Sequence, residues 1–143
     1  MLRLFFLIII TSTSYFSFAQ AKTFKTEIEV KAFSRKISEL FKNDSIIELF
    51  TEVKKYWPVP ENELTDMQTK TISTLNIIKA RYGASIGFIK VKEEKINDFA
   101  LRETYLIRYT NHALRLIFTY YKNNEGWIVN GFTWDDSFVE EFK

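Results

Sequence analysis

Residues 99–134 read FALRETYLIRYTNHALRLIFTYYKNNEGWIVNGFTW, and this stretch decides the fold of the chain. It contains three runs rich in β-branched and aromatic residues, separated by the turn-forming segments Asn111-His112 and Lys122–Gly126. Along each run the side chains alternate between two faces, as they do in a β-strand. The pattern therefore predicts three consecutive antiparallel strands.

One face of the three predicted strands is mainly apolar, and we expect the core to form there. It carries Leu101, Glu103, Tyr105, Ile107 and Tyr109, then Leu114, Leu116, Phe118 and Tyr120, then Ile128, Asn130, Phe132 and Trp134. The reverse face is mixed, because arginines and threonines stand among Leu106, Ile117 and Val129. We expect a partner to cover part of that outer face, and a homodimer is one such arrangement.

The register of the first hairpin follows from its loop. A two-residue loop at Asn111-His112 places Ile107 opposite Leu116 and Glu103 opposite Tyr120. In this register the apolar faces of both strands coincide, whereas a one-residue slip would separate them.

The first 19 residues have the pattern of a cleaved signal peptide. Arg3 precedes a short apolar run from Leu4 to Ile10, and Ser17-Phe18-Ala19 offers small residues for cleavage after Ala19. Ala19-Gln20-Ala21 fits the same pattern two residues later, which leaves cleavage after Ala21 as an alternative. A membrane anchor is the competing interpretation, but the unbroken apolar run is shorter than the roughly 20 residues a bilayer needs. We therefore expect a secreted or periplasmic protein without a membrane span, and residues 20–143 as its single domain.

The composition limits the class of protein. The chain has no cysteine, so neither a lipid anchor on cysteine nor disulfides are available, and an apolar core must stabilise the fold. Hydrophobic residues make up 46% of the chain and aromatic residues 17%, which is enough for such a core. A net charge of +2 gives no basis for a nucleic-acid partner.

Helical periodicity precedes the strands. We expect helices over residues 21–42, from Ile46 to Tyr56, and over residues 66–82. Asp44 or Ser45 suits the cap of the second helix, although Asn43-Asp44-Ser45 is also a glycosylation sequon. A fourth strand is expected over residues 85–91, with a bulge at Gly87, followed by a charged turn over residues 92–98 and a short helical turn in the tail.

Helices followed by antiparallel strands indicate an α+β domain with helices on one face of a four-stranded sheet. The break at Asn43-Asp44, the long hairpin Tyr105–Tyr121 and the closing strand Gly126–Phe132 resemble those of small secreted NTF2-like, cystatin-like α+β domains. This resemblance implies a curved sheet and a conical pocket between sheet and helices. Enzymes of that kind carry Asp, His or Tyr in the pocket, and this chain shows no recognisable copy of such a set.

Glu103 and Asn130 are the polar exceptions on the predicted inner face. Burying either side chain without a partner costs a few kcal/mol, so we expect both to form the polar wall of a small cavity. Tyr105, Tyr120 and Trp134 would be its apolar lining. A structural role, with both polar groups tied to backbone or solvent, is the alternative. With a single histidine and no cysteine, we expect no metal site and no cofactor.

Two function classes remain. The first is a non-enzymatic binding module for a small apolar ligand or a protein partner. The second is a small pocket enzyme of the isomerase or dehydratase type, with Glu103 as general base and a second polar group within hydrogen-bond reach. Whether the pocket between sheet and helices is open would separate the two classes best, and a solid core would favour interaction through the outer surface.

The signal-peptide interpretation makes a direct prediction. We expect the protein isolated from its native host to lack residues 1–19, or 1–21 if cleavage follows Ala21. Intact mass spectrometry reads this out, and a mass that retains the first segment would indicate a membrane anchor instead.

Overall fold

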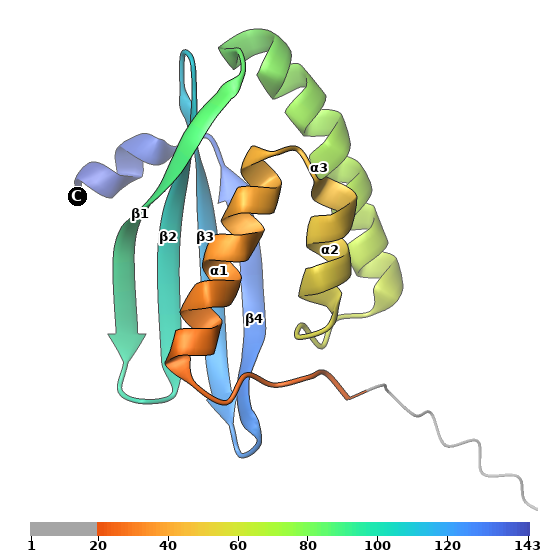
Figure 1. Ribbon diagram of the computed structural model, residues 1–143, viewed down its shortest axis with the longest axis vertical. Coiled ribbons are helices and arrows are strands. Elements are labelled where there is room, and N and C mark those ends of the chain that lie inside the picture. Colours follow the sequence, from red (N-terminus) through yellow and green to blue (C-terminus); the bar gives the residue numbers. More distant parts are fainter. Residues whose placement is uncertain (1–19) are drawn as a thin grey trace, which may run out of the picture.

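The structure, a computed structural model, describes residues 20–143 and is an α+β domain (Figure 1). Three helices come first: α1 (Glu27–Lys42), α2 (Ile46–Lys54) and α3 (Glu61–Tyr82). Four strands follow: β1 (Ser85–Ile96), β2 (Ala100–Tyr109), β3 (Ala113–Asn123) and β4 (Gly126–Asp135), and then the 3-10 helix η1 (Phe138–Phe142). The strands form one antiparallel sheet in the order β1-β2-β3-β4. The predicted fold class is thereby confirmed, while the predicted signal peptide lies outside the described residues.

Helix α1 lies across the sheet and supplies much of the core. Thr26 caps its N-terminus in a capping box with Glu29, so the helix begins at Glu27 and not at Ala21 as predicted. Phe33, Ile37 and Phe41 recur at helical spacing and are buried, as the periodicity indicated. The buried face also carries Ser34 and Ser38, both with no solvent exposure.

The residues predicted as the first turns of α1 instead run along the edge of β4. Phe24 and Trp127 exchange two backbone hydrogen bonds of 2.8 Å. The Phe24 ring stacks on Tyr56, with 3.9 Å between ring centroids. The Tyr56 carbonyl in turn accepts a hydrogen bond from the Val129 amide at 3.0 Å. This extended segment therefore covers part of the open edge of the sheet.

Helices α2 and α3 differ from the prediction at their ends. Neither Asp44 nor Ser45 caps α2 with a side-chain hydrogen bond, and Asp44 instead takes a positive φ of 62° and pairs with Lys79. Helix α3 begins at Glu61, directly after Pro60, so the predicted polar connector forms its first turn. Acidic residues suit that first turn because they face the positive end of the helix dipole. At the other end Gly83, with φ 85°, stops α3 as predicted.

Strand β1 is longer than predicted and bends along its length (Figure 1). The register with β2 shifts between Ser85 and Gly87, which confirms the bulge at Gly87, and shifts again between Lys90 and Lys92. The predicted charged turn is wrong over residues 92–96, which continue the strand. Charged side chains are compatible with an edge strand, since they discourage pairing with other chains. The turn itself lies at Asn97, where φ is 47°.

The hairpin of β2 and β3 keeps the predicted faces but not the predicted register. Ile107 lies opposite Leu114, and Glu103 lies opposite Phe118. The Tyr109 amide donates to the His112 carbonyl at 2.8 Å, so the two-residue loop is Thr110-Asn111 and the predicted loop is displaced by one residue. Moving the loop by one residue shifts the register by two, which leaves each side chain on its own face.

A second departure lies in β4, where the register shifts opposite Thr119 and Tyr120. Thr119 pairs with Gly131 and Tyr120 pairs with Val129, so Asn130 is the unpaired residue of a bulge. The bulge reverses the alternation, and Trp127 and Val129 are buried before it as Phe132 is after it. The prediction that Ile128 and Asn130 face the core is therefore wrong, and Asn130 is exposed.

Among residues 20–143, η1 is the element that packs on the outer face of the sheet. Arg115 on β3 contacts the Asp135 carboxylate at 2.8 Å and the Glu141 carboxylate at 2.9 Å. Phe138 packs its ring against His112, with 5.1 Å between centroids. These contacts hold the predicted short helical turn of the tail against the sheet. Within residues 20–143, no helix is both long and apolar enough to cross a bilayer.

The N-terminal segment yields a stability prediction. Phe24→Ala should lower the free energy of unfolding by about 3–5 kcal/mol, because it removes a buried aromatic ring together with its stacking contact to Tyr56. Ile28→Ala is the matched control: Ile28 is 80% exposed, so its loss should change stability by less than about 0.5 kcal/mol. Urea unfolding followed by circular dichroism measures both, and equal effects would contradict the role given to Phe24.

Candidate functional site

The five residues predicted to line one cavity lie in three different surroundings. Glu103 and Tyr120 are fully buried in the core, and Tyr105 is buried with its edge at the surface. Trp134 is partly buried against α3, where its indole N–H donates to Thr71 Oγ1 at 3.2 Å. Asn130 is exposed in the β4 bulge. The described residues therefore do not form the predicted shared lining, because the bulge turns Asn130 away and side chains fill the space between α1 and the sheet.

Glu103 is the most unusual of these residues, because it is a carboxylate with no solvent exposure. Its Oε1 atom accepts a hydrogen bond from Lys90 Nζ at 2.6 Å. Its Oε2 atom is the one buried side-chain oxygen or nitrogen of residues 20–143 that lacks a hydrogen-bond partner. The Lys90 side chain reaches inward from the edge strand and remains 32% exposed. The ion pair thus extends from the core to the rim of the sheet.

The pair belongs to a chain of four charges. Lys90 also pairs with Glu93, which in turn accepts from Lys31 Nζ on α1 at 2.8 Å. Hydrogen bonds from Lys31 and Lys90 lower the pKa of Glu93 to about 2. Burial lowers the pKa of Lys90, but its two carboxylate partners outweigh burial and raise that pKa to about 12. Two lysines and two glutamates therefore balance one another where α1 meets the β1–β2 hairpin.

The tyrosines beside Glu103 are held as neutral phenols. Tyr120 and Ser34 share a hydrogen bond of 2.6 Å between their hydroxyls, inside the core. Burial, followed by the charge of Glu103, raises the pKa of Tyr105 to about 12. Burial likewise raises the pKa of Tyr120 well above its usual value. Glu103, the two tyrosines and Ser34 lie in the core under α1, so their first role is to stabilise the fold.

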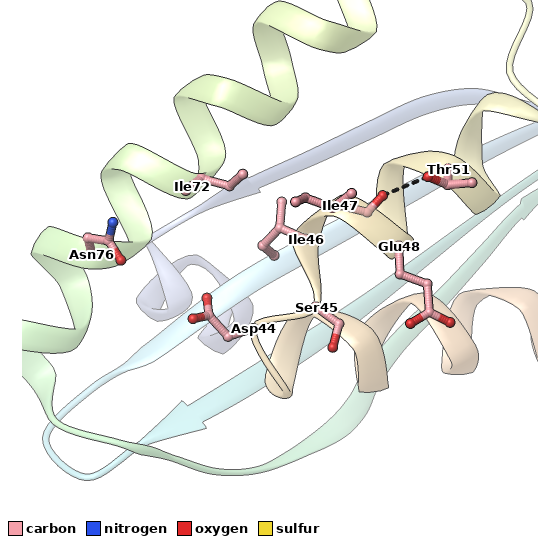
Figure 2. Close-up of a pocket in the computed structure, with 8 residues that line it drawn as sticks. All are labelled: Asp44, Ser45, Ile46, Ile47, Glu48, Thr51, Ile72 and Asn76. Carbon is pink, nitrogen blue, oxygen red and sulfur yellow. Dashed lines mark hydrogen bonds between the residues drawn. The ribbon is translucent and has the colours of Figure 1, made fainter.

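A hollow of about 630 Å³ lies elsewhere, between α2 and α3 (Figure 2). We call it the α2–α3 cleft. Its apolar lining is Ile46 and Ile47 of α2 and Ile72 of α3, and Figure 2 shows Ile72 pointing toward the two α2 isoleucines. Ile46 is buried, whereas Ile47 is 65% exposed. The remaining lining residues are polar: Asp44, Ser45, Glu48, Thr51 and Asn76.

Two of these polar groups already have partners. Asp44 pairs with Lys79, and the Thr51 hydroxyl donates to the Ile47 carbonyl at 2.9 Å (Figure 2). The Asn76 side chain lies at the same end of the cleft as Asp44 (Figure 2). The cleft thus combines an apolar wall with a polar end, which is the usual make-up of a small-molecule site.

Sequence reasoning did not identify this cleft. The predicted helix from Ile46 to Tyr56 did not separate the roles of the two isoleucines, although adjacent residues on a helix point about 100° apart. The adjacent residues Leu49 and Phe50 of the same helix are both buried, so helical spacing alone did not mark Ile47 as the exposed one. The partner residue Ile72 was not distinguishable, because nothing in the sequence shows how α3 lies against α2.

Comparisons with models of protein families, with curated proteins and with solved structures gave no match for this chain. Among residues 20–143, no three His, Asp or Glu side chains gather closely enough to hold a metal ion.

The Glu103–Lys90 pair leads to a double-mutant prediction. Lys90→Met should lower the free energy of unfolding by about 3 kcal/mol at pH 7, because it leaves a buried carboxylate without its counter-ion. Combining Lys90→Met with Glu103→Leu should restore most of the loss, since an apolar pair replaces the ionic one.

Lys92→Met is the control, because Lys92 lies two residues along the same strand and its side chain is 44% exposed. It should change stability by no more than about 1 kcal/mol. Urea unfolding of the four proteins provides the measurement. If Lys90→Met costs no more than Lys92→Met, the ion pair does not support the core.

Proposed function

We propose that this protein is a non-enzymatic binding module that takes a small, mainly apolar ligand into the α2–α3 cleft. The observation that carries the proposal is the isoleucine wall of that cleft. Ile47 is 65% exposed beside Ile46 and Ile72, around a hollow of about 630 Å³. Ligand pockets commonly have volumes of about 300–1,000 Å³ and a mainly apolar lining.

Burial of apolar surface would supply most of the binding free energy. Covering an exposed isoleucine side chain is worth roughly 1.5–3 kcal/mol. The polar end of the cleft, with Asn76, offers hydrogen bonds that would orient one polar group of the ligand. The ligand we expect is therefore a compact apolar molecule with a single polar end.

The enzymatic alternative, with Glu103 as general base, has less support from the geometry. A general base must come within about 2.6–3.2 Å of the proton it removes. Glu103 has no exposed surface, and its Oε1 atom is already bonded to Lys90. The second oxygen lies in the packed core, so a substrate would have to displace α1 to reach it.

The site of action forms part of the same proposal. The N-terminal pattern supports removal of residues 1–19 and release into the periplasm or the surrounding medium. The order of helices and strands supports an NTF2-like or cystatin-like relationship. In such domains the ligand enters between helices and sheet, whereas the cleft proposed here lies between two helices.

The test uses the neutral fluorescent probe N-phenyl-1-naphthylamine. We expect the parent protein to bind it and Ile47→Asn to weaken binding about tenfold, because a polar amide interrupts the apolar wall. Substitution of an exposed residue should leave stability within about 0.5 kcal/mol. The fluorescence titration reports the dissociation constant.

Ile77→Asn is the matched control, because Ile77 on α3 is 67% exposed and does not line the cleft. Binding to this variant should equal binding to the parent. Equal weakening in both variants, or no binding to the parent, would overturn the proposal. If the surface binds a protein partner instead, the parent should not bind the probe but should form a complex with that partner, and Ile47→Asn should abolish the complex.

A further inference from the structure

A second cleft, of about 550 Å³, lies between the C-terminal half of α1 and the first half of β1. We call it the α1–β1 cleft. Its charged lining residues are Arg35 and Lys42 of α1 and Lys90 of β1, and no carboxylate lines it. Phe88 of β1 and Tyr105 of β2 provide its aromatic surface. The cleft shares no lining residue with the α2–α3 cleft and is independent of the function proposed there.

The three cations of the α1–β1 cleft are not equivalent. Lys90 is neutralised, because it belongs to the balanced chain with Glu103, Glu93 and Lys31. Arg35 and Lys42 take part in none of the ion pairs that residues 20–143 form. They are seven residues apart on α1, so they lie on the same side of the helix two turns from each other. The cleft therefore carries two surplus positive charges.

Tyr105 adds a hydrogen-bond donor to this surface. With a pKa of about 12, its phenol keeps its proton at neutral pH, and the charge of Arg35 is near enough to influence it. The Phe88 ring lies 6.3 Å from the Tyr105 ring, centroid to centroid, and extends the aromatic surface toward β1. An anionic head group would thus find donors beside a surface that accepts an apolar body.

The shape of the cleft is fixed by the bulge in β1. The Ser85 hydroxyl donates to the Lys42 carbonyl at 2.6 Å and ties the end of α1 to the start of the strand. Next to it the strand bulges at Gly87, where an added Cβ would meet no atom within 4 Å. The space beside the bulge is open, so a ligand can enter from the edge of the sheet.

We infer that the α1–β1 cleft binds a small organic acid, with its anionic head group between Arg35 and Lys42 and its apolar body against Phe88 and Tyr105. The two cations supply the charge that the ligand neutralises, and the Tyr105 hydroxyl donates to the head group. Because hydrogen bonds to charged groups are the stronger ones, the anionic form of a ligand is favoured over its neutral analogue.

The experiment compares 4-phenylbutyrate with its neutral amide, 4-phenylbutyramide, in titrations followed by amide chemical shifts at low salt. We expect shifts at Phe88, Lys90 and Tyr105, and about tenfold tighter binding of the acid. The double variant Arg35→Gln/Lys42→Gln should lose this preference while binding the amide as before. Tyr105→Phe keeps the ring and should weaken binding of the acid alone, several-fold.

Lys22→Gln/Arg108→Gln is the matched control, because it removes the same charge from two exposed residues outside the cleft. It should bind the acid as the parent does. Equal binding of acid and amide, an equal loss in the control variant, or shifts confined to other surfaces would each overturn the inference. Inorganic phosphate should bind more weakly than the acid, and equal binding would show that the aromatic surface has no part in recognition.

Discussion

The buried ion pair between Glu103 and Lys90 is the constraint around which this domain is arranged. A carboxylate at the centre of an apolar face is tolerated only when a counter-charge reaches it. Lys90 supplies that charge from the edge strand, across the pair of strands β1 and β2. The lysine must point inward at that place, which ties the path of β1 to the position of Glu103. The charge pair therefore links the core to the edge of the sheet.

The Glu103–Lys90 pair is connected both to helix α1 and to the core beneath it. Glu93 and Lys31 carry the charge network onto α1, so the helix is held to the hairpin by ionic contacts as well as by packing. Under the same helix Ser34 bonds the Tyr120 hydroxyl, among side chains that are almost fully buried. Open space is left outside this buried centre, in the α1–β1 cleft beside the bulged strand and in the α2–α3 cleft beyond the core.

Much of the sheet could be predicted from sequence, because alternation along β2 and β3 is strong. Even with a misplaced loop, the faces of residues such as Ile107 and Phe118 were right, since an even shift in register preserves them. In α1 the periodicity placed Phe33, Ile37 and Phe41 correctly on the buried face, but Ile28 of the same stripe is 80% exposed and the stretch around Phe24 is not helical. A single aromatic residue at helical spacing does not reveal that its partners are Tyr56 and a strand over 100 residues away.

The misplacement of Asn130 has a single physical origin. A β-bulge adds a residue to one strand only, so it reverses the alternation beyond it without changing composition. Asn130 was placed inside for that reason, although Glu103, on an unbulged strand, was placed correctly. The counter-ion of Glu103 could not be predicted either. Lys90 is one of several charged residues of an edge strand, and no local sequence feature distinguishes it from the others. Clefts between helices depend on packing angles that the sequence does not state.

The most direct test of this account is side-chain NMR of the lysine ammonium groups. If Lys90 is held by Glu103 and Glu93, its ammonium protons should exchange slowly with water and give a resolved signal at neutral pH. That signal should shift in Glu103→Gln, while the ammonium of Lys22, which is exposed, remains invisible through fast exchange. A Lys90 ammonium that exchanges as fast as Lys22, or that ignores the loss of the Glu103 charge, would contradict the central role of the pair.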